Sequence, residues 1–124
     1  ILLTAAQNDP KPYLPTEKQQ KIVPVIEYIS KYYYKNITND SLAAIAGLST
    51  VYFRKLFTSV MGVSPITYVH QFRIEKAKEL LSSTDYSMKE ICVMVGYSDP
   101  NYFSRSFKKN VGVTPTEYKE LENR

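Results

Sequence analysis

The side chains best suited to chemistry in this chain are cationic and amide groups that lie in two windows almost free of acids. Residues 41–74 contain no Asp or Glu, and residues 91–116 contain only Asp99. The candidates inside these windows are Arg54, Lys55, Arg73, Asn101, Arg105, Lys108 and Lys109. Such groups bind phosphates, and Arg and Asn also pair with the edges of guanine and adenine. Two such windows in a chain of net charge +4 suit two contacts with one polyanion, although a chance gap in the charge pattern is the alternative.

Catalytic and metal chemistry finds little support among the remaining residues. Cys92 is the single cysteine and His70 the single histidine, so a multi-cysteine zinc site and an internal disulfide are excluded. There is no phosphate-binding glycine loop and no nucleophile–base pair that we can place. We therefore predict that the chain is not an enzyme and uses no metal and no cofactor. We interpret Cys92 as core packing, and His70 as a packing or surface residue of a helix.

The chain contains an internal duplication, which tells where the candidate residues are held. Residues 42–49 align with 91–98, residues 52–57 with 102–107, and residues 62–68 with 112–118. The offset is 49 residues between Gly47 and Gly96, and 50 from Phe53 and Phe103 onward. All four glycines fall into matched pairs. Such a repeat indicates two copies of one supersecondary unit.

Each copy reads as a helix, a tight turn and a second helix. Gly47 and Gly96 follow the first helices, where a left-handed backbone favours glycine. Ser49 is expected to cap the second helix of the first copy. In the second copy Asp99 is expected to cap and Pro100 to take the first helical position, which explains the inserted residue. Spacings of three and four between Phe53, Leu56 and Phe57, and between Phe103 and Phe107, predict one apolar face on each second helix.

These elements predict an all-α fold of two tandem helix-turn-helix subdomains joined by a long helix. We expect the first subdomain over residues 21–63, the joining helix over 64–82 and the second subdomain over 83–124. Residues 1–20 are interpreted as a linker from an upstream domain. A first helix is expected from about Ile22 to Tyr34, and Pro24 either begins it or kinks it. No segment shows the alternation of a strand.

The second helix of each unit has the size and polarity to enter the major groove of DNA. The residues expected to contact bases are Val51, Arg54, Lys55, Asn101, Ser104 and Arg105. Those expected to contact phosphates are Ser49, Thr50, Thr58, Arg73, Ser98, Lys108 and Lys109. For Arg73, an internal salt bridge is an equally reasonable interpretation. We therefore predict sequence-specific binding to double-stranded DNA, with the two helices in adjacent grooves.

Residues 22–121 resemble the DNA-binding domain of the AraC/XylS family of transcription regulators. The resemblance is carried by the stretch from Leu42 to Phe57, the Gly62-Val63-Ser64-Pro65 link, and the second-copy run from Ile91 to Phe107 with Gly112-Val113-Thr114-Pro115. It implies seven helices and base contacts from the exposed residues of both second helices. It also implies an activator that contacts RNA polymerase and carries a separate sensing or dimerising domain. Cys92 departs from the alanine common in the family, and Thr50-Val51 from a Pro-Ser type start.

Two other functions remain open at this stage. A helical protein-interaction module would bind its partner with little dependence on salt, and an architectural DNA-binding protein would bind all sequences alike. A single thiol permits a reducing compartment, and no apolar run is long enough to span a bilayer. We therefore expect a cytoplasmic protein without a membrane partner.

Overall fold

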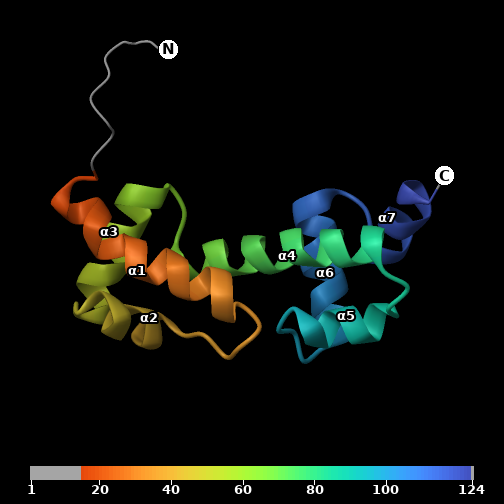
Figure 1. Cartoon of the computed structure of the whole chain (residues 1–124), viewed down its shortest axis with the longest axis horizontal. Helices are drawn as coiled ribbons and strands as arrows, with labels where there is room; N and C mark the ends of the chain where they lie inside the picture. The colour runs from red at the N-terminus through yellow and green to blue at the C-terminus, as the bar shows by residue number, and fades with distance from the viewer. Residues whose placement is uncertain (1–14, 124) are drawn as a thin grey trace, which may run out of the picture.

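The computed structural model describes residues 15–123, which form seven α-helices and, within that range, no strand. The helices are α1 (Glu17–Tyr32), α2 (Asn39–Ala46), α3 (Thr50–Met61), α4 (Pro65–Ser83), α5 (Met88–Met94), α6 (Pro100–Val111) and α7 (Pro115–Glu122). Helix α4 runs through the middle of the molecule, with α1–α3 at one end and α5–α7 at the other (Figure 1). The predicted all-α architecture is confirmed.

The first helix begins earlier than the sequence prediction. Helix α1 starts at Glu17 because Thr16 and Gln19 form a capping box, in which each side chain accepts a hydrogen bond from the other residue's backbone amide. Pro24 lies inside α1 on its exposed side, so the helix does not begin there. The linker expected over residues 1–20 lies outside the described residues as far as residue 14, and it is helical from Glu17 on.

Two separate hydrophobic cores hold the molecule together, and α4 contributes to both. Val69 of α4 packs in the first core with residues of α1, α2 and α3. Ile74, Ala77 and Leu81 of the same helix pack in the second core with residues of α5 and α6. One helix of 19 residues, ~28 Å long at 1.5 Å per residue, therefore spans both subdomains.

The duplication extends to the packing of the aromatic rings. The ring centroids of Phe57 and Tyr68 lie 5.7 Å apart at 70°, and those of Phe107 and Tyr118 lie 5.6 Å apart at 71°. It also includes a helix that the alignment missed. The buried residues of α1 are Ile22, Val25 and Ile29, and their spacing recurs in Ile74, Ala77 and Leu81 of α4. Helix α4 therefore serves the second subdomain as α1 serves the first.

Candidate nucleic-acid interface

The turn before α3 is set by a small residue, a glycine and a cap. Ala43 is buried in α2, which lets α3 approach closely. Gly47 adopts the left-handed conformation (φ 71°), and the amide of Leu48 donates to the carbonyl oxygen of Ala43 at 3.0 Å. The Ser49 hydroxyl then accepts from the amide of Tyr52 and caps α3, as predicted. These local interactions fix which face of α3 is exposed.

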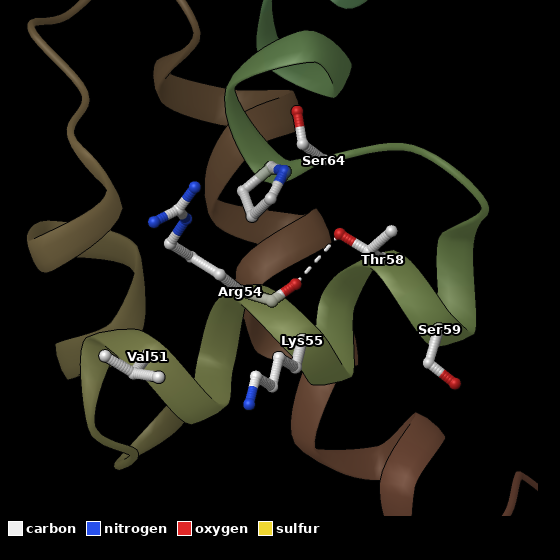
Figure 2. Close-up of a pocket in the computed structure, with 7 residues that line it drawn as sticks. Val51, Arg54, Lys55, Thr58, Ser59 and Ser64 are labelled. Carbon is white, nitrogen blue, oxygen red and sulfur yellow. Dashed lines mark hydrogen bonds between the residues drawn. The ribbon is translucent and has the colours of Figure 1, made fainter.

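Helix α3 turns its apolar side inward and presents a polar side to solvent. Phe53, Leu56 and Phe57 are buried. The exposed face carries Val51, 67% of which is accessible, together with Arg54, Lys55 and Thr58. Figure 2 shows these side chains on one side of α3, beside the start of α4. They line an open hollow of about 620 Å³, together with Ser59, Ser64 and Pro65.

The hydroxyl groups around α3 make local hydrogen bonds. Thr50 donates to the carboxylate of Asp40 at 2.6 Å, which ties the start of α3 to α2. Thr58 donates to the carbonyl oxygen of Arg54 at 2.9 Å (Figure 2). The oxygen of either hydroxyl keeps acceptor capacity, but its proton is already used within the protein. Of the residues expected to contact phosphate here, Thr50 and Thr58 therefore have an internal role as well.

Helix α6 repeats this arrangement with more charge. Asp99 caps it by accepting from the amide of Asn101 at 2.9 Å, and Pro100 occupies the first helical position, as predicted. Phe103 and Phe107 are buried. Of the residues expected to contact DNA here, Asn101, Arg105, Lys108 and Lys109 of α6 are exposed, as is Ser98 in the turn before it. The guanidinium of Arg105 lies 6.0 Å from the centre of the Tyr102 ring.

Ser104 differs from the other residues expected to contact bases. It occupies the position in α6 that Arg54 occupies in α3, since the two copies are offset by 50 residues at this point. Its side chain is half-buried, and its hydroxyl lies 3.7 Å from the sulfur of Met88 at the start of α5. Arg105 is the counterpart of Lys55. The second copy therefore presents Asn101 and Arg105 more openly than Ser104.

Arg73 is placed inside the molecule, where its guanidinium binds the protein's own backbone. Only 8% of this residue is exposed. Its Nε donates to the carbonyl oxygen of Tyr33 at 2.6 Å, and its Nη2 donates to that of Lys35 at 2.8 Å. The phosphate contact expected for Arg73 is thus replaced by internal hydrogen bonds, made to carbonyl groups rather than to a carboxylate. The sequence could not reveal this, because both partners lie about 40 residues away along the chain.

The cations on the exposed faces of α3 and α6 form no ion pair with a carboxylate among residues 15–123, although Lys108 acts on the Glu117 carboxylate at longer range. The ion pairs in that range join Lys76 to Glu79 and Lys78 to Glu75, all on α4. Arg54, Lys55, Arg105, Lys108 and Lys109 are exposed to solvent and take part in neither of these ion pairs. Cations exposed on the surface of a helix and not held in ion pairs attract a polyanion.

The single cysteine and the single histidine are packing residues of the second subdomain. Cys92 is fully buried in α5, and burial raises the pKa of its thiol. His70 is half-buried on α4, with its Nδ1 2.8 Å from the hydroxyl oxygen of Tyr97. Within the described part of the chain, no three His, Cys, Asp or Glu side chains are grouped to hold a metal ion.

No helix between residues 15 and 123 is both long and apolar enough to cross a membrane.

Comparison with known proteins agrees with this geometry. A family model described as a helix-turn-helix domain matches residues 42–121. The HTH-type transcriptional regulator YisR of Bacillus subtilis is 32% identical over 111 residues, which cover 90% of this chain. The chain belongs to the AraC/XylS family of helix-turn-helix transcription regulators. The xylose operon regulatory protein of Escherichia coli is another relative, 32% identical over 102 residues.

Solved structures of AraC-type domains share the fold. The C-terminal domain of AraT, a response regulator from Geobacillus stearothermophilus, superposes with a TM-score of 0.81 at 34% identity, over 86% of this chain and 88% of that one. The DNA-binding domain of AdpA, solved in complex with a target DNA, superposes with a TM-score of 0.79 at 25% identity, over 82% of this chain and 91% of that one. The chain is therefore a DNA-binding domain of the AraC type.

The AraC-type domain is one part of its curated relatives. The chain spans 39% of the length of YisR and 26% of the xylose operon regulatory protein.

The sequence analysis missed two residues of the surface around α3. Ser59 and Ser64 line the hollow beside Arg54. Ser64 caps α4, and a serine before a proline in the sequence indicates a helix start rather than a surface for DNA.

Proposed function

We propose that this AraC-type domain reads one DNA duplex with α3 and α6 placed in two successive major grooves. The observation that carries the proposal is the matched pair of exposed cationic helix faces, without ion pairs, at the two ends of α4. Successive major-groove faces lie ~34 Å apart. Helix α4, about 28 Å long, and the helices packed at its ends have the size to bridge that separation.

The proposal assigns base contacts to residues on the first two turns of both helices. Arg54, Lys55 and Arg105 would donate to guanine, Asn101 would pair with adenine, and Val51 would contact a thymine methyl group. Phosphate contacts are assigned to Ser49, Thr50, Thr58, Ser98, Lys108 and Lys109, which flank these turns. Ser104 and Arg73 are left out, because their polar groups already face the protein interior.

The test is a selection of bound sequences from a random duplex library. The proposal expects two short motifs whose centres lie about one helical turn, ~10 base pairs, apart. Recovery of one motif alone would reject the second helix as a reader. Enrichment of no motif would favour an architectural protein that binds all sequences alike.

Salt dependence separates DNA binding from a protein-interaction role. Each phosphate contact releases counterions, so the affinity for the selected duplex should fall steeply as salt rises, by ~10³-fold or more between dilute and moderately concentrated salt. Binding that is nearly independent of salt would contradict the proposal. The affinity for a random duplex is measured as well, because specific binding should exceed nonspecific binding by ~10³-fold or more.

The proposal extends to the whole regulator in which such a domain works. The domain has no catalytic role here and directs a bacterial transcription activator to its site in the cytoplasm, where it contacts RNA polymerase. The support is family membership, together with the relative AdaA of Bacillus subtilis, which is named a bifunctional transcriptional activator and DNA repair enzyme and is 31% identical over 97 residues. Signal sensing and dimerisation are assigned to a separate domain. Transcription in vitro from a promoter that carries the selected site would test activation.

A further inference from the structure

Arg73 lies where α4 passes from one core to the other. Val69, one turn before it, packs in the first core, and Ile74 and Ala77 pack in the second. Among residues 15–123, Arg73 is the single buried side chain that carries a charge. Burying a cation is costly unless hydrogen bonds and opposite partial charges compensate it. The partners of Arg73 therefore show what the residue holds in place.

On one side, Arg73 binds the end of the first subdomain's leading helix. Tyr33 is the residue that ends α1, and its carbonyl oxygen accepts from Nε at 2.6 Å. The carbonyl oxygen of Lys35, in the loop that follows, accepts from Nη2 at 2.8 Å. The C-terminal end of a helix carries partial negative charge, which compensates the cation. The guanidinium thus ties the end of α1 to the middle of α4.

On the other side, Arg73 contacts the turn that precedes α6. Its guanidinium carbon lies 5.7 Å from the centre of the Tyr97 ring, and that ring lies 5.3 Å from the ring of Phe103 in α6. A Cβ atom added at Gly96 would lie 2.9 Å from Arg73 Nε and 3.0 Å from the Cα of Tyr34. Figure 1 shows the loop after α1 and the turn after α5 facing each other on the same side of α4. Arg73 is therefore a contact shared by both subdomains, beside Tyr33, which packs against both cores.

We propose that Arg73 is a positioning residue that fixes the second recognition helix relative to the first, and so sets the spacing of the two half-sites in DNA. The proposal rests on the function proposed above. Two linked binding modules gain affinity only where their geometry lets both engage at once. A fixed angle between α3 and α6 would concentrate that gain on one spacing, whereas a loose joint would spread it over several spacings.

The planar guanidinium is the part of Arg73 that matters for this role. Its fork of N–H groups serves two carbonyl oxygens that belong to different residues, while its central carbon lies over the Tyr97 ring. Lysine can donate to two carbonyl oxygens, as Lys119 does to those of Leu81 and Thr84, but it has no planar fork that holds two donors in fixed directions beside an aromatic ring. Lysine would, however, keep the positive charge, which is what a simple phosphate contact requires. Arg73→Lys therefore separates positioning from phosphate binding.

The experiment compares the wild-type domain with Arg73→Lys and Arg73→Met on duplexes chosen by selection with the wild-type domain. Binding is measured by fluorescence anisotropy at low salt. The probes are the full site, each half-site with the other half scrambled, and full sites with one base pair added or removed between the halves. Circular dichroism and thermal melting report whether each variant is folded.

Both variants should bind the full site about tenfold or more weakly, and each half-site within about twofold of the wild type. The wild type should lose about tenfold or more when the spacing changes, and the variants about twofold or less. Equal losses on half-sites and full site, a preserved spacing preference, or full rescue by Arg73→Lys would each overturn the proposal. A wild-type domain that selects a single motif would reject the proposed function instead.

Gly96→Ala supplies a second route, whether or not the Arg73 variants fold. The added methyl group should displace Arg73 and the loop at Tyr34, and so weaken the spacing preference in the same way. Gly47→Ala is its matched control, because Gly47 also has a left-handed backbone but has no atom within 4 Å of an added Cβ. The control should lose stability yet keep the wild-type spacing preference. A control that loses the preference as fully as Gly96→Ala would overturn the proposal.

Discussion

Arg54 and Arg105 are the arginines on the exposed faces of the two recognition helices. Neither forms an ion pair within residues 15–123, so neither has to break one to bind DNA. Arg54→Ala and Arg105→Ala should each cost ~1–3 kcal/mol of binding on the selected site and relax the preference at the base concerned. Competition anisotropy against single-base variants of the site would measure this. Lys78→Ala, which removes a cation already paired with Glu75, should change binding little. Equal losses on random duplex would assign both arginines to phosphates.

His70 makes stability depend on pH at the junction of α4 and α6. Burial lowers its pKa below 6.5, and the neighbouring Arg73 cation lowers it further. Between the pKa of His70 in the folded chain and its higher pKa in the unfolded chain, the unfolded chain binds more protons. The stability that neutral His70 contributes is therefore fully present above the unfolded pKa and is lost as the pH falls through the folded pKa. Burial also raises the pKa of Tyr97, so its hydroxyl keeps the proton that neutral His70 can accept.

The pH prediction is checked by urea unfolding between about pH 7.5 and about pH 5, in the wild type and in His70→Gln. The free energy of unfolding should fall with pH in the wild type, and this fall should be smaller in the variant, which has no charge to bury. Glu117, whose pKa is lowered by hydrogen bonds from Thr114, titrates below 4.5 and so below this range. The same pH dependence in both proteins would contradict the assignment to His70.

At the scale of single helices, α5 depends on its cap. It has 7 residues, too few to be stable alone, and its start is fixed by the capping box of Ser87 and Glu90. Ser87→Ala should lower the free energy of unfolding by ~1 kcal/mol, because the amide of Glu90 loses its partner. Ser83→Ala is the control, since Ser83 is exposed and bonds only to the carbonyl oxygen of Glu79 in its own helix. Equal effects in urea unfolding would show that the cap contributes nothing of its own.

The sequence predicts the elements of this fold well wherever the cause is local. Glycine after a helix, a hydroxyl or carboxylate before one, and apolar spacings of three and four all act within a few residues, so Gly47, Asp99 and Phe103 lie where expected. Contacts between distant segments have no such local signal. The burial of Arg73 depends on the loop after α1, and the half-burial of Ser104 depends on Met88 at the start of α5. The DNA contacts of the remaining candidate residues stay predictions.

At the scale of the molecule, two small cores share α4 and the cluster that Arg73 forms with Tyr33, Gly96 and Tyr97. Each core includes fully buried phenylalanines, Phe53 and Phe57 in the first and Phe103 and Phe107 in the second. A core of this size has little stability to spare. Damage to one core should therefore unfold its own subdomain, while the other keeps its helices and its half of the DNA site.

Phe103→Ala tests this independence, since removing a buried phenylalanine costs ~3–5 kcal/mol. Hydrogen exchange should show protection lost in α5, α6 and α7 but kept in α1, α2 and α3. The variant should still bind the first half-site near wild-type affinity and lose the second, and Phe53→Ala should do the reverse. Loss of protection throughout the chain in either variant would contradict the prediction. The cluster around Arg73 would then couple both cores into one cooperative unit, because it is the contact that reaches from the end of α1 to the turn before α6.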